Sequence, residues 1–287
     1  MIILKIQGGL GNQLFQYAAG RAISIANQVE LALDLSWFEN QTGINTKRVY
    51  ELGAFKIKGR VTNGDEIFWC RIHQNRILSR LRFLHRKWTH IRDQNQAFSD
   101  KSLENINNVY LDGYWQSYRY FDQVFHAIRE EFMPSIDPSH ADTILIERIK
   151  SLNSVSVHIR RGDYVTNPRA ASFHGLCSLE YYQTAMSCLE RRISCPHYFI
   201  FSDDIEWAKQ NIHIESGVTF MESTEGRSSV DDLRLMSLCK HNIIANSSFS
   251  WWAAWLNFNP DKLVFAPKKW FVNESPEFLI PKDWIVL

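Results

Sequence analysis

Hydrophobic and polar positions alternate with two different periods along the second half of the chain. Short apolar runs rich in β-branched and aromatic residues predict strands. Between them, apolar residues recur at the spacing of a helix face. We expect strands at 155–159, 198–201, 218–221, 243–245 and 263–266, and helices at 178–192, 205–211, 230–240 and 248–257. Regular alternation of strand and helix predicts a parallel, doubly wound sheet.

The first half begins with the same strand–loop–helix–strand order. We expect a strand at 2–6, a helix at 14–26 and a strand at 29–34, with a glycine-rich loop after the first strand. A strand at 109–112 and helices at 121–132 and 141–150 follow, and Pro134 to Pro138 is the best linker candidate. We therefore divide the chain into two Rossmann-like halves, residues 1–150 and 151–287.

Length, composition and charge narrow the class of protein. The chain has 287 residues, of which 45% are hydrophobic and 22% charged, as in a globular protein of one large or two ordinary domains. A net charge of +1 gives no sign of nucleic-acid binding. The five cysteines form no Cys-x-x-Cys pair, which favours reduced thiols in a cytoplasmic protein. We find no signal peptide and no apolar run of membrane-spanning length.

The strand at 155–159 carries the first candidate chemistry. Side chains alternate across a strand, so His158 and Arg160 share one face while Val157 and Ile159 share the other. Arg160 and Arg161 lie side by side at the strand's carboxyl end, where open α/β sheets bind ligands. Two guanidinium groups suit a phosphate. The alternative is an arginine–aspartate pair that braces a turn, with Asp163 as the partner.

Two further stretches precede helices. The loop after the first strand contains Gly9-Leu10-Gly11, which lacks the third glycine of a dinucleotide fingerprint; its glycines would bring a sugar or a pyrophosphate close to the main chain. Near the other end, strand 243–245 leads to Ser247 and Ser248, which suit a helix amino terminus. Such a terminus attracts phosphate, although many serine caps bind nothing.

Together these stretches resemble the bacterial α-1,2-fucosyltransferases, a glycosyltransferase family 11-like group that transfers fucose from GDP-fucose. The resemblance rests on three motifs spread over nearly the whole chain: Gly-Gly-Leu-Gly-Asn-Gln at 8–13, His-Ile-Arg-Arg-Gly-Asp at 158–163 and Asn-Ser-Ser-Phe-Ser-Trp-Trp at 246–252. It implies the glycosyltransferase B fold, with an acceptor-side first half and a GDP-fucose-binding second half that face each other across a cleft.

The resemblance also assigns roles to residues. Asn12 is expected near the reaction centre, Gln13 supports its loop, and an acid at the position of Asp232 holds the guanine, with Asp231 as the fallback. The expected catalytic residues are Asn12, His158, Arg160, Arg161 and Asp163; the expected donor-binding residues are Gly9, Gly11, Gln13, Asp203, Asp232, Ser247, Ser248, Phe249 and Ser250. Asp203 and Asp204 also suit the cap of the next helix. A salt bridge from Asp232 to Arg227 or Arg234 is the structural alternative.

The expected reaction is inverting transfer of L-fucose to the 2-hydroxyl of a galactose-terminated oligosaccharide or lipid-linked glycan, in O-antigen or other surface-polysaccharide synthesis. No Asp-x-Asp or His-x-x-x-His pattern is present, so we expect no metal and no other cofactor. Asp163 and His158 are both candidates for the general base. The alternatives are a fucosyltransferase of different linkage on the same fold, and a nucleotide-sugar sensor without turnover.

One basic segment is not part of these motifs. Residues 71–92 contain seven arginines and lysines and no acid, with apolar residues near helical spacing. A solvated helix face is one interpretation. Peripheral contact of a cytoplasmic enzyme with the anionic inner membrane face is the other.

Overall fold

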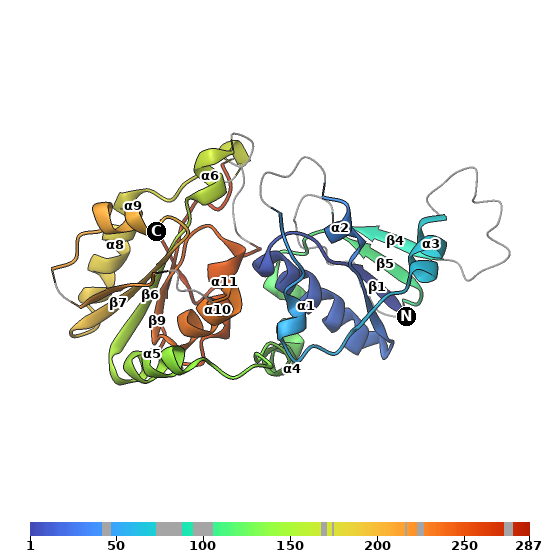
Figure 1. The fold of residues 1–287 in the computed structure, drawn as a ribbon, viewed down its shortest axis with the longest axis horizontal. Helices are drawn as coiled ribbons and strands as arrows, with labels where there is room; N and C mark the ends of the chain where they lie inside the picture. Colours follow the sequence, from blue (N-terminus) through green and yellow to red (C-terminus); the bar gives the residue numbers. More distant parts are fainter. Residues whose placement is uncertain are drawn as a thin grey trace. The chain divides into compact units, whose positions relative to one another are not determined.

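A computed structural model describes residues 1–41, 47–72, 88–93, 106–167, 171–173, 175–215, 217–222, 227–272 and 278–287. Within these ranges, Trp69, Arg71, Ile72, Asp163 and Thr166 are described by their backbone only. The chain divides into two compact units, Met1–Ser135 and Ile136–Leu287, each built on its own parallel sheet (Figure 1).

The first unit contains a five-stranded parallel sheet in the order β3-β2-β1-β5-β4. Its strands are β1 (Ile2–Lys5), β2 (Leu31–Asp34), β3 (Arg60–Val61), β4 (Thr89–Arg92) and β5 (Val109–Asp112). Its helices are α1 (Leu10–Asn27), α2 (Ser36–Glu39), η1 (Leu52–Ala54), α3 (Gly64–Ile72), η3 (Tyr118–Tyr120), η4 (Asp122–Val124) and α4 (Phe125–Glu131). Strand β1 is buried in the centre and pairs with β2 and β5, so the loops after β1 and β5 lie at one edge.

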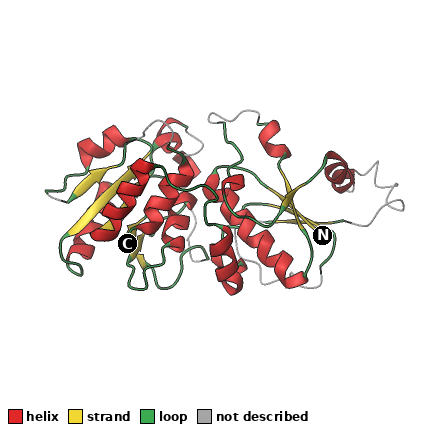
Figure 2. Cartoon of the chain, turned by 60° about the horizontal axis from the view of Figure 1, so that its bottom comes forward, coloured by secondary structure: helices red, strands yellow, loops and turns green. Residues whose placement is uncertain are grey.

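The second unit contains a six-stranded parallel sheet in the order β11-β10-β9-β6-β7-β8. Its strands are β6 (Asn153–Ile159), β7 (Pro196–Ser202), β8 (Val218–Phe220), β9 (His241–Ile243), β10 (Val264–Ala266) and β11 (Ile285–Val286). Its helices are α5 (His140–Ser151), α6 (Gly162–Thr166), α8 (Leu179–Glu190), α9 (Ile205–Asn211), α10 (Ser229–Leu238) and α11 (Ser248–Leu256). Helices lie on both sides of the strands (Figure 2).

The alternation of side chains along β6 assigns a different environment to each face of the second sheet. Val155, Val157 and Ile159 pack into a core with Tyr182 of α8 and Ala208 of α9. The other face is more polar. There the Asn242 Nδ2 donates to Ser156 Oγ and to the carbonyl of Met236 in α10, and the His158 ring lies 5.6 Å from the Phe249 ring of α11.

The predicted elements are largely present, with some differences. Residues 162–166 form α6, a short helix that is not among the predicted elements. The short edge strands β3, β4 and β11 were not predicted; with two to four residues each, they carry too little pattern to detect. The helical interpretation of residues 71–92 is wrong at its end, where β4 pairs with β5. Residues 73–87 of that segment lie outside the described residues.

The division between the units lies between Ser135 and Ile136, inside the predicted linker, rather than between residues 150 and 151. Helix α5 therefore belongs to the second unit, because it packs on β6 and on α10. Two doubly wound parallel-sheet units nevertheless match the fold class predicted from the sequence.

Candidate active site

Three neighbouring strands of the second unit end at one edge of the sheet. Strand β6 pairs with β7 on one side and with β9 on the other, and all three run in the same direction. The chain therefore brings Arg160 and Arg161, Asp203 and Asp204, and the start of α11 to the carboxyl edge. This is where ligands bind in open α/β sheets.

The two arginines are each paired with an acid from β7, although the sequence suggested Asp163 as a partner. Arg160 Nη1 lies 2.8 Å from Asp203 Oδ2, and Arg161 Nε lies 3.2 Å from Asp204 Oδ2. The Arg161 backbone N–H also donates to Asp203 Oδ1, at 2.8 Å. The Asp163 side chain lies outside the described residues.

The two guanidinium groups have different surroundings. The Arg161 guanidinium stacks on the Trp207 ring of α9, with 3.8 Å between Cζ and the ring centroid. That contact and the pair with Asp204 hold it on the α9 side of the sheet. Arg160 lies on the face that it shares with His158, and therefore on the side of α11. Both predicted arginines reach the edge, but their side chains serve opposite faces.

Gly162 allows this close arrangement. A Cβ atom at this position would lie 2.5 Å from Asp203 Oδ2. Any larger residue would have to displace the carboxylate that pairs with Arg160. The glycine after the arginine pair is therefore explained by the approach of a side chain from the neighbouring strand.

His158 is buried next to this edge, with 5% of its surface exposed. Its pKa is lowered to about 4, mainly by burial; the charge of Asp203 opposes this effect and the charge of Arg160 adds to it. Its Nδ1 makes no hydrogen bond to any described residue. His158 is thus a neutral imidazole at pH 7, which makes it a weak base and not a cation for phosphate.

The predicted serines at the start of α11 differ in burial and in hydrogen bonding. Ser247 is the N-cap residue with extended backbone, and its side chain makes no capping hydrogen bond. Ser248 and Phe249 are half-buried. Ser250 is fully buried and donates to the carbonyls of Ala245 and Ser247, so its hydroxyl serves the helix start itself.

Asn246 was quoted only as part of a motif, yet it determines how this start is held. Its Nδ2 donates to the carbonyls of Gly175 and Trp270, each at 3.2 Å. The Tyr164 hydroxyl of α6 in turn donates to the Asn246 carbonyl, at 3.3 Å. A buried amide between a strand and a helix N-cap is the signal that could have indicated this role.

The predicted guanine-binding acid lies at the beginning of α10. Asp231 forms a capping box, because its carboxylate accepts from the backbone N–H and the hydroxyl of Ser228. Asp232 makes only a long ion pair, 3.7 Å from Oδ1 to Arg227 Nε, and 36% of its side chain is exposed. Asp231 is thus occupied in helix capping, whereas the Asp232 carboxylate is partly exposed, with its Oδ1 buried on the Arg227 side.

In the first unit, the glycine-rich loop and α1 follow β1. Gly8 adopts a left-handed backbone with φ of 82°, and Gly9 is the N-cap of α1. The Gln13 side chain is buried and donates to the carbonyls of Gly8 and Val49, while its oxygen accepts from the Glu51 N–H. Gln13 therefore supports the loop, as predicted, by tying it to a neighbouring segment.

Asn12 lies in the first turn of the same helix and is held from the loop after β5. The Gln116 Nε2 donates to Asn12 Oδ1, at 2.8 Å. Trp115, directly before Gln116, has a positive φ of 54°, and its N–H donates to Asp93 Oδ2. Gln116 was not among the expected site residues, and the structure brings it to Asn12. Gly11 is a buried residue of α1.

The described residues contain neither a metal site nor a membrane-spanning helix. No group of three His, Cys, Asp or Glu side chains is arranged to hold a metal ion within the described ranges. Among the helices in those ranges, none has the length and apolar character needed to cross a bilayer.

Comparison with known proteins identifies relatives along the whole chain. Residues 1–285 match the family described as glycosyl transferase family 11. The chain is 34% identical over 300 residues to O-antigen biosynthesis glycosyltransferase WbnK of Escherichia coli, covering 98% of this chain and 99% of that protein. It is 37% identical over 290 residues to an alpha-1,2-colitosyltransferase of Escherichia coli, covering 99% and 98%.

The fold is also found among solved structures. NodZ alpha-1,6-fucosyltransferase, soaked with GDP-fucose, is similar with a TM-score of 0.51 and 16% sequence identity, over 92% of this chain and 94% of that one. At this identity the similarity concerns the fold alone, and it confirms the predicted fold class.

Proposed function

Since the chain belongs to glycosyl transferase family 11, and is therefore a glycosyltransferase, we propose that it transfers L-fucose from GDP-β-L-fucose to the 2-hydroxyl of a galactoside. The α-1,2 linkage and a role in O-antigen synthesis are supported by the names of the two Escherichia coli relatives. Transfer from a β-linked donor to an α-linked product requires inversion at the sugar carbon.

The observation that carries the proposal is the meeting of Arg160 with the start of α11 at adjacent strand ends. Negative charge grows on the diphosphate as the bond to the sugar breaks, and preorganised donors aimed at that charge lower the barrier. In the proposed site, Arg160 and the Ser247–Ser248 helix start receive the diphosphate. Asp203 keeps the Arg160 guanidinium in place, and Asp232 accepts from the N–H groups of guanine.

Deprotonation of the acceptor hydroxyl requires a base near the sugar. His158 is disfavoured because its ring is buried, with 5% of its surface exposed, so an acceptor hydroxyl has little access to it. Asp163 was otherwise expected to orient the arginines, but Asp203 and Asp204 already pair with them. We therefore propose that Asp163 accepts the proton of the acceptor hydroxyl. Asp163→Asn is then expected to lose turnover and to retain GDP binding.

The test is a donor and acceptor screen with purified protein. Incubation of GDP-fucose with β-galactosides is expected to yield a product in which fucose is α-linked to the galactose 2-hydroxyl, as read by NMR of the product. GDP-mannose serves as the donor control. Absence of GDP-fucose consumption with every galactoside would contradict the proposal.

A second candidate donor sugar is colitose, a 3-deoxy analogue of L-fucose, because the chain is 37% identical to an alpha-1,2-colitosyltransferase. Competition between the two GDP-sugars for one acceptor distinguishes them. Peripheral contact of residues 71–92 with an anionic membrane remains a proposal from the sequence, since most of that segment lies outside the described residues.

A further inference from the structure

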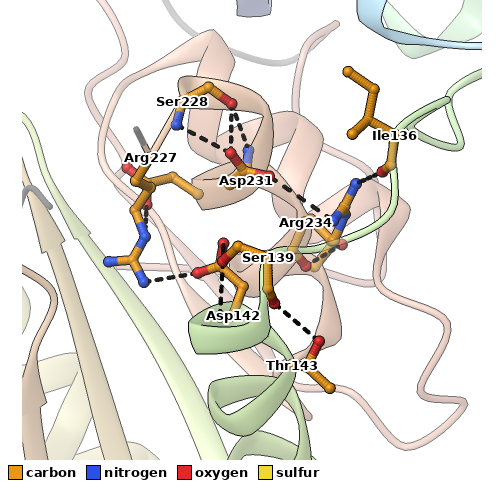
Figure 3. Close-up of polar contacts among 10 residues, drawn as sticks. Ile136, Ser139, Asp142, Thr143, Arg227, Ser228, Asp231 and Arg234 are labelled. Carbon is orange, nitrogen blue, oxygen red and sulfur yellow. Dashed lines mark hydrogen bonds and ion pairs between the residues drawn. The ribbon is translucent and has the colours of Figure 1, made fainter. Parts of the chain in front are cut away.

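A buried network of charges lies between the start of α10 and the start of α5 (Figure 3). At its centre is Arg227, whose side chain is 8% exposed. Its Nη2 donates to Asp142 Oδ1 at 3.0 Å, and its Nη1 donates to the carbonyl of Glu222. On the other side, its Nε faces Asp232 Oδ1 at 3.7 Å. One buried cation therefore lies between two carboxylates.

The two carboxylates differ in their remaining partners. Asp142 is 5% exposed, and its second oxygen accepts from the hydroxyl of Ser139, the N-cap of α5. Asp142 is thus fixed by its own helix cap. Asp232 Oδ1 and Arg227 Nε, in contrast, make no hydrogen bond to any described residue. The distance is too long for a hydrogen bond, and Oδ1 itself is buried against Arg227, so the exposed part of the Asp232 carboxylate is what remains to accept from a ligand.

Other charges around Asp232 come from α10 itself and from α5, one of the two helices that pack on α10. Asp231 precedes it, but its carboxylate is engaged by Ser228 and lies 3.8 Å from Arg234. Helix α5 contributes Asp142, and α11 has no titratable side chain. Burial raises the pKa of Asp232 to about 6; Arg227 lowers that pKa, and Asp231 and Asp142 raise it. Asp232 is therefore half ionised near pH 6, and the ionised form is lost as the pH falls below that value.

We propose that Arg227 is a positioning residue that keeps the Asp232 carboxylate ionised for recognition of the nucleotide base, and that Asp142 holds Arg227 in place for this task. The inference rests on the proposed role of Asp232 in binding guanine. A protonated carboxyl offers one donor and loses an acceptor site, so it matches the N–H groups of guanine less well. The preference for guanine is then lost at low pH, and the Asp142–Arg227 pair sets the pH at which it is lost.

The experiment measures the affinity of the full chain for GDP and for ADP, by calorimetry or competition, between pH 5 and pH 8. The phosphates of the two nucleotides titrate alike, so the ratio of affinities reports the base. In the unmodified protein the preference for GDP is expected to fall with a midpoint near pH 6. Arg227→Gln removes the charge, which should raise the midpoint by about one pH unit. Arg227→Lys should restore it in part.

Asp142→Asn provides a change of opposite sign. Its amide oxygen can still accept from Arg227 and hold it in place, but the negative charge that raises the Asp232 pKa is gone, so the midpoint should move to lower pH. A residue that acted only on folding would not shift the two midpoints in opposite directions. Arg234→Gln is the matched control, because it removes the same charge from α10, directly after the Arg227 segment, but faces Asp231 and the Ile136 carbonyl. No shift is expected there.

Thermal unfolding of each variant shows that it is folded, and Arg227→Lys and Asp142→Asn remain informative if Arg227→Gln does not fold. An unchanged midpoint in folded Arg227→Gln would overturn the inference. So would Asp232→Asn with an undiminished preference for GDP, because the base would then be read elsewhere. Neither result would affect fucosyl transfer by the unmodified enzyme, so the proposed function is tested separately.

Discussion

The loops at the carboxyl edges of the two sheets are held in place by different chemistry. In the first unit, the contacts to the glycine-rich loop and to Asn12 come from the neutral amides of Gln13 and Gln116, although an ion pair between Lys5 and Asp112 lies at the ends of β1 and β5. In the second unit, the contacts come from charged pairs, because Arg160 and Arg161 are fixed by Asp203 and Asp204. The loops at the carboxyl edges of the two sheets are thus held by different kinds of polar group.

The difference agrees with the proposal that the two units bind different substrates. A galactoside is neutral and is recognised by donors and acceptors without net charge. A diphosphate carries negative charge and requires cations that are preorganised and only partly solvated. The comparison therefore supports an acceptor-side first unit and a donor-side second unit, and the following changes test it.

Removal of Arg160 is expected to have the largest effect. Arg160→Ala should reduce turnover about a hundredfold or more, because it removes charge-assisted hydrogen bonds to the leaving diphosphate and leaves Asp203 unpaired beside it. Arg161→Ala should reduce turnover less than tenfold, since that guanidinium is engaged by Trp207 and Asp204. Steady-state kinetics with thermal unfolding measure both. Equal losses would contradict the assignment of the two side chains to opposite faces.

A smaller loss is expected in the first unit. Gln116→Ala removes one neutral hydrogen bond to Asn12, which is worth about 1 kcal/mol, and should reduce kcat/KM for the acceptor about fivefold. The dissociation constant for GDP should not change. Gln41→Ala is the matched control, because that amide bonds only backbone groups of its own segment. Weaker GDP binding by Gln116→Ala would break the distinction between the units.

Substitution of one glycine in each unit tests the comparison between the units further. Gly8→Ala places a side chain on a left-handed backbone with φ of 82°, so it should cost about 1 kcal/mol of unfolding free energy. Gly162→Ala meets the Asp203 carboxylate instead, and should weaken GDP binding about tenfold, the weight of one charge-assisted hydrogen bond. Chemical denaturation and calorimetry separate the two. Gly9→Ala, with φ of −79° and its nearest neighbour 3.7 Å from the added Cβ, should leave stability unchanged.

Chelation is expected to have no effect. With Arg160 and the α11 start to receive the diphosphate, we predict full activity in excess EDTA. The assay is fucose transfer before and after dialysis against the chelator. Loss of activity that Mg²⁺ or Mn²⁺ restores would show that the second unit relies on an ion as well as on its own cations.

Local pattern was sufficient for the elements that carry the site. Strict alternation in residues 155–159 identified β6 and assigned His158 and Arg160 to one face. Helix α9 was predicted at its observed bounds, 205–211, and Ser178, the first residue of the predicted helix 178–192, caps α8 by accepting from the Tyr181 N–H. Each of these features depends on neighbours within one or two turns of chain, which a single sequence displays directly.

Partners across the sheet could not be obtained in the same way. The acids that hold the arginine pair follow β7, and Asp203 accepts from the Arg161 N–H across a separation of 42 residues. Nothing in either segment indicates that β7, rather than another strand, lies next to β6. Likewise, only the capping box distinguishes Asp231 from its neighbour Asp232. The sequence by itself determined which residues end the strands, and the tertiary structure decided which of them meet, because strand order depends on packing of the whole sheet.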